Sequence, residues 1–185
     1  MFQLSLVDQI RLSFGSVATS YRAHSRAAER LTARARQSNI FIALLLALAT
    51  GASLLALTGF RPFQIAAVSL AAVSLIGYTI SLSLDFGPRA HAHRACAAQL
   101  WLICEKYRAL LAEVHDGLVE LPAVTKRRDD LMREVQIVYE HALPADREAY
   151  KIAREALGGG ESVPSDQDID RLLPASLRQE ARSTT

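Results

Sequence analysis

The chain has 185 residues, of which 50% are hydrophobic, 6% are aromatic and 22% are charged. Its formal net charge of +2 is too small, and its basic residues too scattered, to form the basic stripe of a nucleic-acid-binding protein. The apolar residues gather between Ile40 and Leu84, where Arg61 is the only charged residue. This concentration argues against an ordinary soluble domain.

Residues 1–37 are predicted to form an amphipathic helix on the cytoplasmic side of a membrane. Their apolar side chains recur at nearly heptad spacing, at Val7, Ile10, Phe14, Val17, Tyr21, Ala28, Leu31 and Ala35. Gly15 and Ser16 predict a looser stretch within this helix. Charged residues interrupt the segment, and it has neither the apolar core nor the cleavage site of a secretory signal.

Residues 38–86 are predicted to form a transmembrane helical hairpin. The two spans, residues 40–57 and 63–84, contain no ionisable group, and each is close to the roughly 20 apolar residues that cross a bilayer core of about 30 Å. Backbone groups in lipid must be satisfied within their own segment, so both runs should be helical. The short link from Thr58 to Pro62 makes the helices antiparallel neighbours. The alternative is a pair of core helices in a soluble bundle, which rarely contain two adjacent uncharged runs of this length.

The distribution of arginines predicts the orientation of the hairpin. Arg61 alone lies in the link, whereas seven arginines flank the two spans: Arg22, Arg26, Arg30, Arg34, Arg36, Arg89 and Arg94. Lys and Arg accumulate on the cytoplasmic side of membranes. We therefore expect a multi-pass membrane protein with both termini in the cytoplasm.

The faces of the two spans indicate helix contacts. The first span carries a row of small residues at Ala43, Ala47 and Gly51, which would let another helix approach closely. The second span carries a stripe of small and polar residues at Gln64, Ala67, Ala71, Ser74, Tyr78 and Ser81. The stripe has two interpretations: it packs against the first span, since such residues ordinarily mark helix contacts, or it lines a wet pathway between several copies.

Residues 87–157 are predicted to form a cytoplasmic helical region. Its first helix carries apolar residues at alternating steps of four and three, as in a coiled-coil seam: Cys96, Leu100, Ile103, Tyr107, Leu110 and Val114. This seam predicts that the helix pairs with the amino-terminal helix and that copies of the chain associate with one another. Cys96 and Cys104 lie about 12 Å apart along this helix, too far for a disulfide, and are expected to be reduced and buried. A cytosolic setting suits them.

Further helices follow in this region. The first should end near residues 115–117, a second should run from Ala123 to His141, and a third should begin near Pro144 and end at residues 158–160. Residues 158–185 are expected to be a mostly flexible tail, with a short helix around residues 169–173. The sequence shows no strand pattern, so the predicted fold is all-α: a membrane hairpin extended by a small helical bundle.

Few residues suggest chemistry. The chain lacks a phosphate-binding glycine loop, and His91, His93 and Cys96 cannot face one metal ion together on a helix. The pairs at residues 115–116 and 140–141 are better explained as solvated helix ends than as acid–base pairs. A basic patch at Lys126, Arg127 and Arg128 would contact lipid headgroups or an acidic partner, or be plain surface. We therefore expect neither enzymatic activity nor a cofactor.

Four motifs follow the hairpin: CEKYRAL at residues 104–110, KRRDDL at 126–131, VYEHALP at 138–144 and AYKIAREAL at 149–157. From about Ala18 to Leu157 the chain resembles the SLATT family, the SMODS and SLOG-associating two-transmembrane effector domains. The motifs are helical and include no catalytic signature.

The resemblance implies an effector of the bacterial inner membrane, in conflict systems that use nucleotide second messengers. It would act as an oligomer by pore formation or membrane disruption, and so cause growth arrest or cell death during phage infection. Expected partners are the lipid bilayer, further copies of the chain, and a separately encoded nucleotide-signal sensor or cyclase. The alternative function is a non-conducting scaffold or sensor subunit anchored in the inner membrane.

Overall fold

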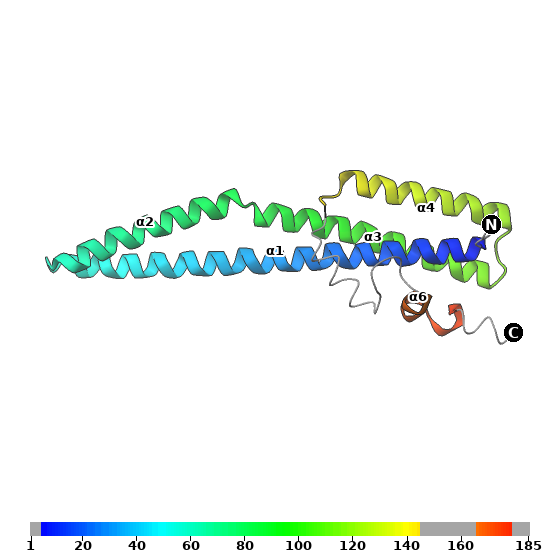
Figure 1. The fold of residues 1–185 in the computed structure, drawn as a ribbon, viewed down its shortest axis with the longest axis horizontal. Coiled ribbons are helices and arrows are strands. Elements are labelled where there is room, and N and C mark those ends of the chain that lie inside the picture. The colour runs from blue at the N-terminus through cyan, green and yellow to red at the C-terminus, as the bar shows by residue number, and fades with distance from the viewer. Residues whose placement is uncertain (1–4, 145–165, 179–185) are drawn as a thin grey trace. The chain divides into compact units, whose positions relative to one another are not determined.

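The computed structural model describes residues 5–144 and 166–178. In this part all regular elements are helical (Figure 1): α1 Leu6–Ala56, α2 Arg61–Ser83, α3 Phe86–His115, α4 Leu121–His141, α6 Asp166–Leu172 and the 3-10 helix η1 Ala175–Leu177. The all-α prediction is confirmed. The helix predicted to begin near Pro144, and the glycines expected to end it, lie outside the described residues.

The chain forms two compact units. One, here called the bundle, comprises the described residues up to Ala28 and from Ala92 onward. The other, here called the hairpin, comprises Glu29–His91. Helix α1, with 51 residues, contributes to both units.

The looser stretch expected near Gly15 and Ser16 is absent, because α1 continues through both residues. Glycine costs a helix only about 1 kcal/mol relative to alanine. Here Gly15 is buried between Phe14 and Val17, which belong to the core, and the Thr19 hydroxyl donates a hydrogen bond of 2.8 Å to its carbonyl. The packing of the residues on both sides of Gly15 therefore outweighs the preference of glycine against helix.

The bundle contains three long helical segments, from α1, α3 and α4. Helix α4 lies parallel to α1, as two hydrogen bonds show: Arg128 bonds Gln9, and Tyr139 bonds Ser20. Both bonds join residues 119 positions apart in the sequence, so the two helices advance in the same direction. It lies antiparallel to α3, where Lys106 pairs with Glu134 and, one heptad further, Glu113 pairs with Arg127. Figure 1 shows α4 turning back along α3.

One hydrophobic core holds these segments together. Helix α1 contributes residues such as Ile10 and Phe14, and α3 contributes Leu100 and Tyr107. The predicted pairing of the two arms is thus confirmed. Helix α4 adds Val124, Leu131 and Val138, and the carboxyl-terminal segment adds Ile169, Leu173 and Leu177. The structure therefore differs over residues 166–178 from the expected flexible tail: the short helix forms, as α6, and three of the segment's apolar side chains enter the core.

The corner between α3 and α4 is set by Gly117, which has φ of 68°. Its N–H bonds the carbonyl of Val114 and the N–H of Leu118 bonds that of Glu113, the Schellman arrangement that satisfies the last carbonyls of a helix. The predicted end of this helix near residues 115–117 is confirmed.

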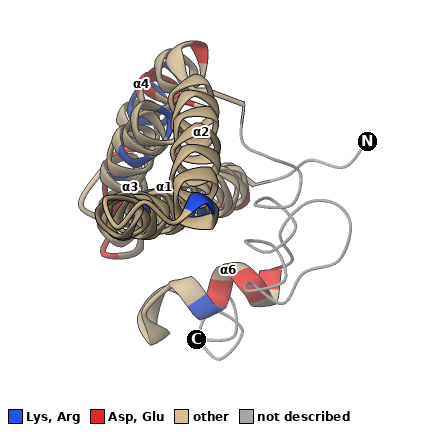
Figure 2. Cartoon of the chain, turned by 90° about the vertical axis from the view of Figure 1, so that its left-hand side faces the viewer, with Lys and Arg blue, Asp and Glu red and all other residues tan. Residues whose placement is uncertain are grey.

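The hairpin pairs the second half of α1 with α2. The Ser38 hydroxyl donates a hydrogen bond of 3.2 Å to Ser81 near the open end. At the closed end Gly59 supplies a φ of 80°, and Pro62 lies in the first turn of α2, where its missing N–H costs nothing. Figure 2 shows α2 almost without charged residues. A break at Leu84 and Asp85 separates α2 from α3, with Asp85 in the left-handed region at φ 46°.

Candidate functional site

The surface of the hairpin is apolar. Helices α1 and α2 are long and apolar enough to cross a membrane, and only 11% of each hydrophobic window is buried within the chain. Large side chains such as Phe41, Leu48, Val68 and Leu75 are more than half exposed. Helices in the core of a soluble protein would be mostly covered, so the interpretation as a soluble bundle does not explain this surface.

The stripe predicted on α2 divides into two heptad rows. Ala67 and Ser74 are buried and Ser81 is half-buried, on the side that packs against α1. The buried Ser74 hydroxyl donates a hydrogen bond of 2.7 Å to the Leu70 carbonyl, so its own helix satisfies it. The other row is exposed and consists of Gln64, Ala71 and Tyr78. One row of the stripe is therefore buried against α1, whereas a pathway lined by the exposed row stays a prediction.

The small-residue row of α1 faces away from α2. Ala43, Ala47 and Gly51 are all exposed, whereas Ile42 and Ala49 make the buried contact with α2. A Cβ atom added to Gly51 would meet nothing within 4 Å. Within one copy the row packs against no other helix of the hairpin.

The seam predicted on α3 is covered by the chain itself. Val114 is partly buried, and the other five residues of the seam are buried: Cys96, Leu100, Ile103, Tyr107 and Leu110. In this conformation these side chains fill the bundle core and leave no surface for joining copies. Self-association through the seam would require the bundle to open.

The two cysteines are free and buried, as predicted. Burial raises the pKa of Cys96. Burial raises that of Cys104 to about 12, against the opposing effects of Arg108 and Arg22. Thiols in this state are poor nucleophiles, so neither cysteine suits catalysis.

Two histidines meet inside the bundle. The Nδ1 atoms of His24 on α1 and His93 on α3 lie 3.0 Å apart, and both rings are buried. One Nδ1 must donate and the other accept, which requires at least one neutral ring. Burial lowers the pKa of His24, and the nearby His93 lowers it further.

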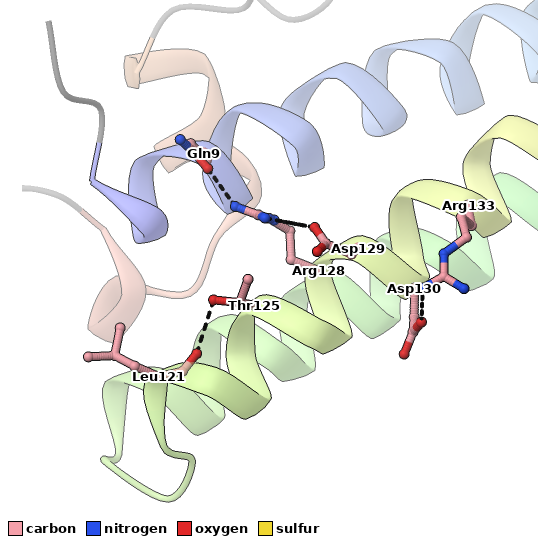
Figure 3. Close-up of polar contacts among 7 residues, drawn as sticks. All are labelled: Gln9, Leu121, Thr125, Arg128, Asp129, Asp130 and Arg133. Atoms are coloured by element: carbon pink, nitrogen blue, oxygen red, sulfur yellow. Dashed lines mark hydrogen bonds and ion pairs between the residues drawn. The ribbon is translucent and has the colours of Figure 1, made fainter.

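The basic patch on α4 is partly paired. Arg127 forms an ion pair with Glu113, while Arg128 bonds Asp129 and reaches the Gln9 side chain on α1 (Figure 3). Lys126 is exposed. Two of the three predicted contact residues therefore also link α4 to its neighbours.

The described part of the chain contains no group of three His, Cys, Asp or Glu side chains that could hold a metal ion. Together with the raised thiol pKa values, its geometry gives no activated nucleophile. The arrangement can offer an apolar membrane surface with exposed small and polar rows, joined to a bundle whose hydrophobic core includes a few buried polar side chains.

A family model described as "SMODS and SLOG-associating 2TM effector domain family 4" matches residues 6–168. The chain belongs to this family. As a SLATT family 4 member it is a two-transmembrane effector domain associated with SMODS and SLOG systems, which accords with the two apolar helices. No curated protein and no solved structure gives a significant match to the chain.

Two buried polar contacts of this SLATT member were missed by the sequence prediction. One is the histidine pair, and the other joins Arg11 to Asp170 and to the Leu177 carbonyl. Arg11 directly follows Ile10, a member of the apolar row of α1, and this position was a signal for a buried arginine. No local pattern indicated its partner 159 residues away.

Proposed function

We propose that the chain is an effector of the bacterial inner membrane, with both termini in the cytoplasm, which permeabilises the membrane as an oligomer. The main support for this proposal is the surface of the hairpin. The hairpin has charged residues only at its ends and is apolar on nearly every side, and it exposes the row Gln64, Ala71 and Tyr78. Lipid disfavours unpartnered polar groups, so such a row gains from facing water or another helix.

One two-helix hairpin cannot enclose a pore, so permeation needs several copies. The exposed row Ala43, Ala47 and Gly51 offers a surface on which a neighbouring helix approaches closely, since small side chains mark helix contacts in membranes. In the assembled state the row Gln64, Ala71 and Tyr78 turns toward the common axis. Permeation then leads to growth arrest or death of the cell.

The trigger in this proposal comes from a separately encoded nucleotide-signalling system. The family description, which names SMODS and SLOG association, supports this part. The signal acts on the bundle, because in this topology it is the cytoplasmic part of the molecule.

The test is membrane potential during induced expression. Wild type is expected to depolarise cells, as reported by a potential-sensitive dye, and Tyr78→Leu is expected to weaken the effect because it removes a hydroxyl from the conducting row. Ile76→Leu, at an equally exposed apolar position, is the matched control and should behave like wild type. Unchanged potential with abundant protein in the membrane fraction would count against permeation.

A further inference from the structure

Residues 166–178, here called the latch, attach to the bundle through a buried arginine. The Arg11 side chain of α1 is only 1% exposed. Its Nη2 donates to Asp170 Oδ1 at 2.5 Å, and its Nη1 donates to the Leu177 carbonyl at 2.9 Å. Both acceptors belong to the latch.

Apolar contacts complete the attachment. Ile169, Leu173 and Leu177 are at most 4% exposed, and they belong to the same core as Ile10 and Phe14 of α1. Helix α6 carries Asp166, Asp168 and Asp170, coloured red in Figure 2, and of these only Asp166 is exposed. The covered side of the latch therefore combines apolar side chains with two carboxylates, those of Asp168 and Asp170.

The attachment is incompletely satisfied. Arg11 Nε is buried and finds no hydrogen-bond partner. A buried guanidinium that leaves one N–H unpaired gives up part of its hydration without full replacement, whereas release of the latch would rehydrate it. The closed state thus combines a small apolar contact with a buried arginine that has one unpaired N–H, a balance that suits reversible release.

The latch also lies at the edge of the shared domain. The family match ends at residue 168, and Ile169, Asp170, Leu173 and Leu177 follow it. The bundle surface that these residues cover belongs to the matched part of the chain. The latch is thus a segment that lies mostly beyond the family match and packs against the matched domain.

We propose that residues 166–178 are an autoinhibitory latch, which holds the amino-terminal part of α1 in the closed bundle until activation releases it. The restraint on activity rests on the proposed function. Helix α1 carries the Arg11 contact at one end and the first membrane span at the other, with no break between them. A change in the packing of its first turns is therefore a change in the helix that enters the membrane.

The test uses the full chain with Asp170→Asn, which keeps the side-chain shape and removes the charge that faces Arg11. Two quantities are measured: hydrogen exchange of residues 6–20 in purified, detergent-solubilised protein, and depolarisation of cells at equal expression. In Asp170→Asn, the rate of hydrogen exchange of residues 6–20 is expected to rise about tenfold because the latch opens, and cells are expected to depolarise faster. Asp166→Asn, at an exposed position of the same helix, is the control and should change neither quantity.

A double variant separates release of the latch from general misfolding. Arg11→Met with Asp170→Leu replaces the buried pair by apolar contacts, an exchange that folded proteins often tolerate. It should restore both wild-type exchange and wild-type depolarisation. Unchanged exchange in Asp170→Asn would overturn the latch. Where wild type depolarises cells, raised exchange with equal or slower depolarisation in Asp170→Asn would overturn it too. If neither wild type nor any variant depolarises cells, the proposed function fails, and the exchange data alone then decide whether the latch closes on α1.

Discussion

The contact between His24 and His93 places a titratable pair where α1 and α3 meet inside the bundle. In the folded chain the pKa of His24 lies below its ordinary value of 6.5, mainly through burial and secondarily through His93. In the unfolded chain the ring takes up a proton near pH 6.5. Between the two pKa values the unfolded state binds more protons, so stability falls as the pH falls.

We therefore predict that the thermal midpoint of the detergent-solubilised protein is highest above about pH 6.5 and decreases as the pH is lowered toward about 5. His24→Gln keeps a polar group beside His93 but cannot titrate, so its midpoint should decrease less. His115→Gln, at the exposed end of α3, serves as the control. A wild-type slope retained in His24→Gln would show that other groups cause the pH dependence.

At the scale of an element, α2 is a helix with two different polar rows. Ser74 is 1% exposed at the contact with α1, whereas Tyr78, one turn further, is about half exposed. A leucine at position 74 would overfill a closed contact between helices. A leucine at position 78 would meet no such limit.

We predict that Ser74→Leu lowers the stability of the protein in detergent by about 1–3 kcal/mol. Tyr78→Leu should change it by no more than about 0.5 kcal/mol, as surface substitutions usually do. Thermal unfolding of both variants in the same micelles provides the measurement. Equal losses would mean that both rows are packed, and the conducting role given to Tyr78 would lose its structural basis.

The elements themselves were largely predictable because their signals are local. Heptad spacing in Val7, Ile10 and Phe14 identified a helix with one buried side, and the absence of charge between residues 40 and 57 identified a span. The looser stretch near Gly15 and Ser16 was wrongly expected, because the preference of glycine against helix, about 1 kcal/mol, is outweighed by the packing of the residues on both sides.

The contacts between elements were less predictable. Steps of three and four on α2 define a stripe wide enough for two rows, and only the position of α1 decides that Ser74 faces inward and Tyr78 outward. The partner of Arg11 is equally hidden, because Asp170 lies in a segment whose composition suggests a mobile tail. The residues of the stripe could thus be named from the sequence, and their division into a buried and an exposed row required the fold.

At the scale of the whole molecule, the question is whether the hairpin conducts or only anchors the bundle. An anchor needs length and apolarity alone, properties that many unrelated hairpins share. A conducting hairpin also needs its outward rows, Ala43, Ala47 and Gly51 on α1 and Gln64, Ala71 and Tyr78 on α2, which an unrelated sequence would not reproduce.

We predict that replacing residues 40–84 with an unrelated two-span hairpin of equal length abolishes depolarisation while leaving the bundle folded and the protein in the membrane. Hydrogen exchange of residues 92–141 checks the bundle, and fractionation checks membrane insertion. A second chimera that restores the two outward rows on the foreign hairpin should recover part of the activity. Full activity in the first chimera would instead favour a membrane-anchored scaffold, because the hairpin would then contribute nothing beyond its affinity for lipid.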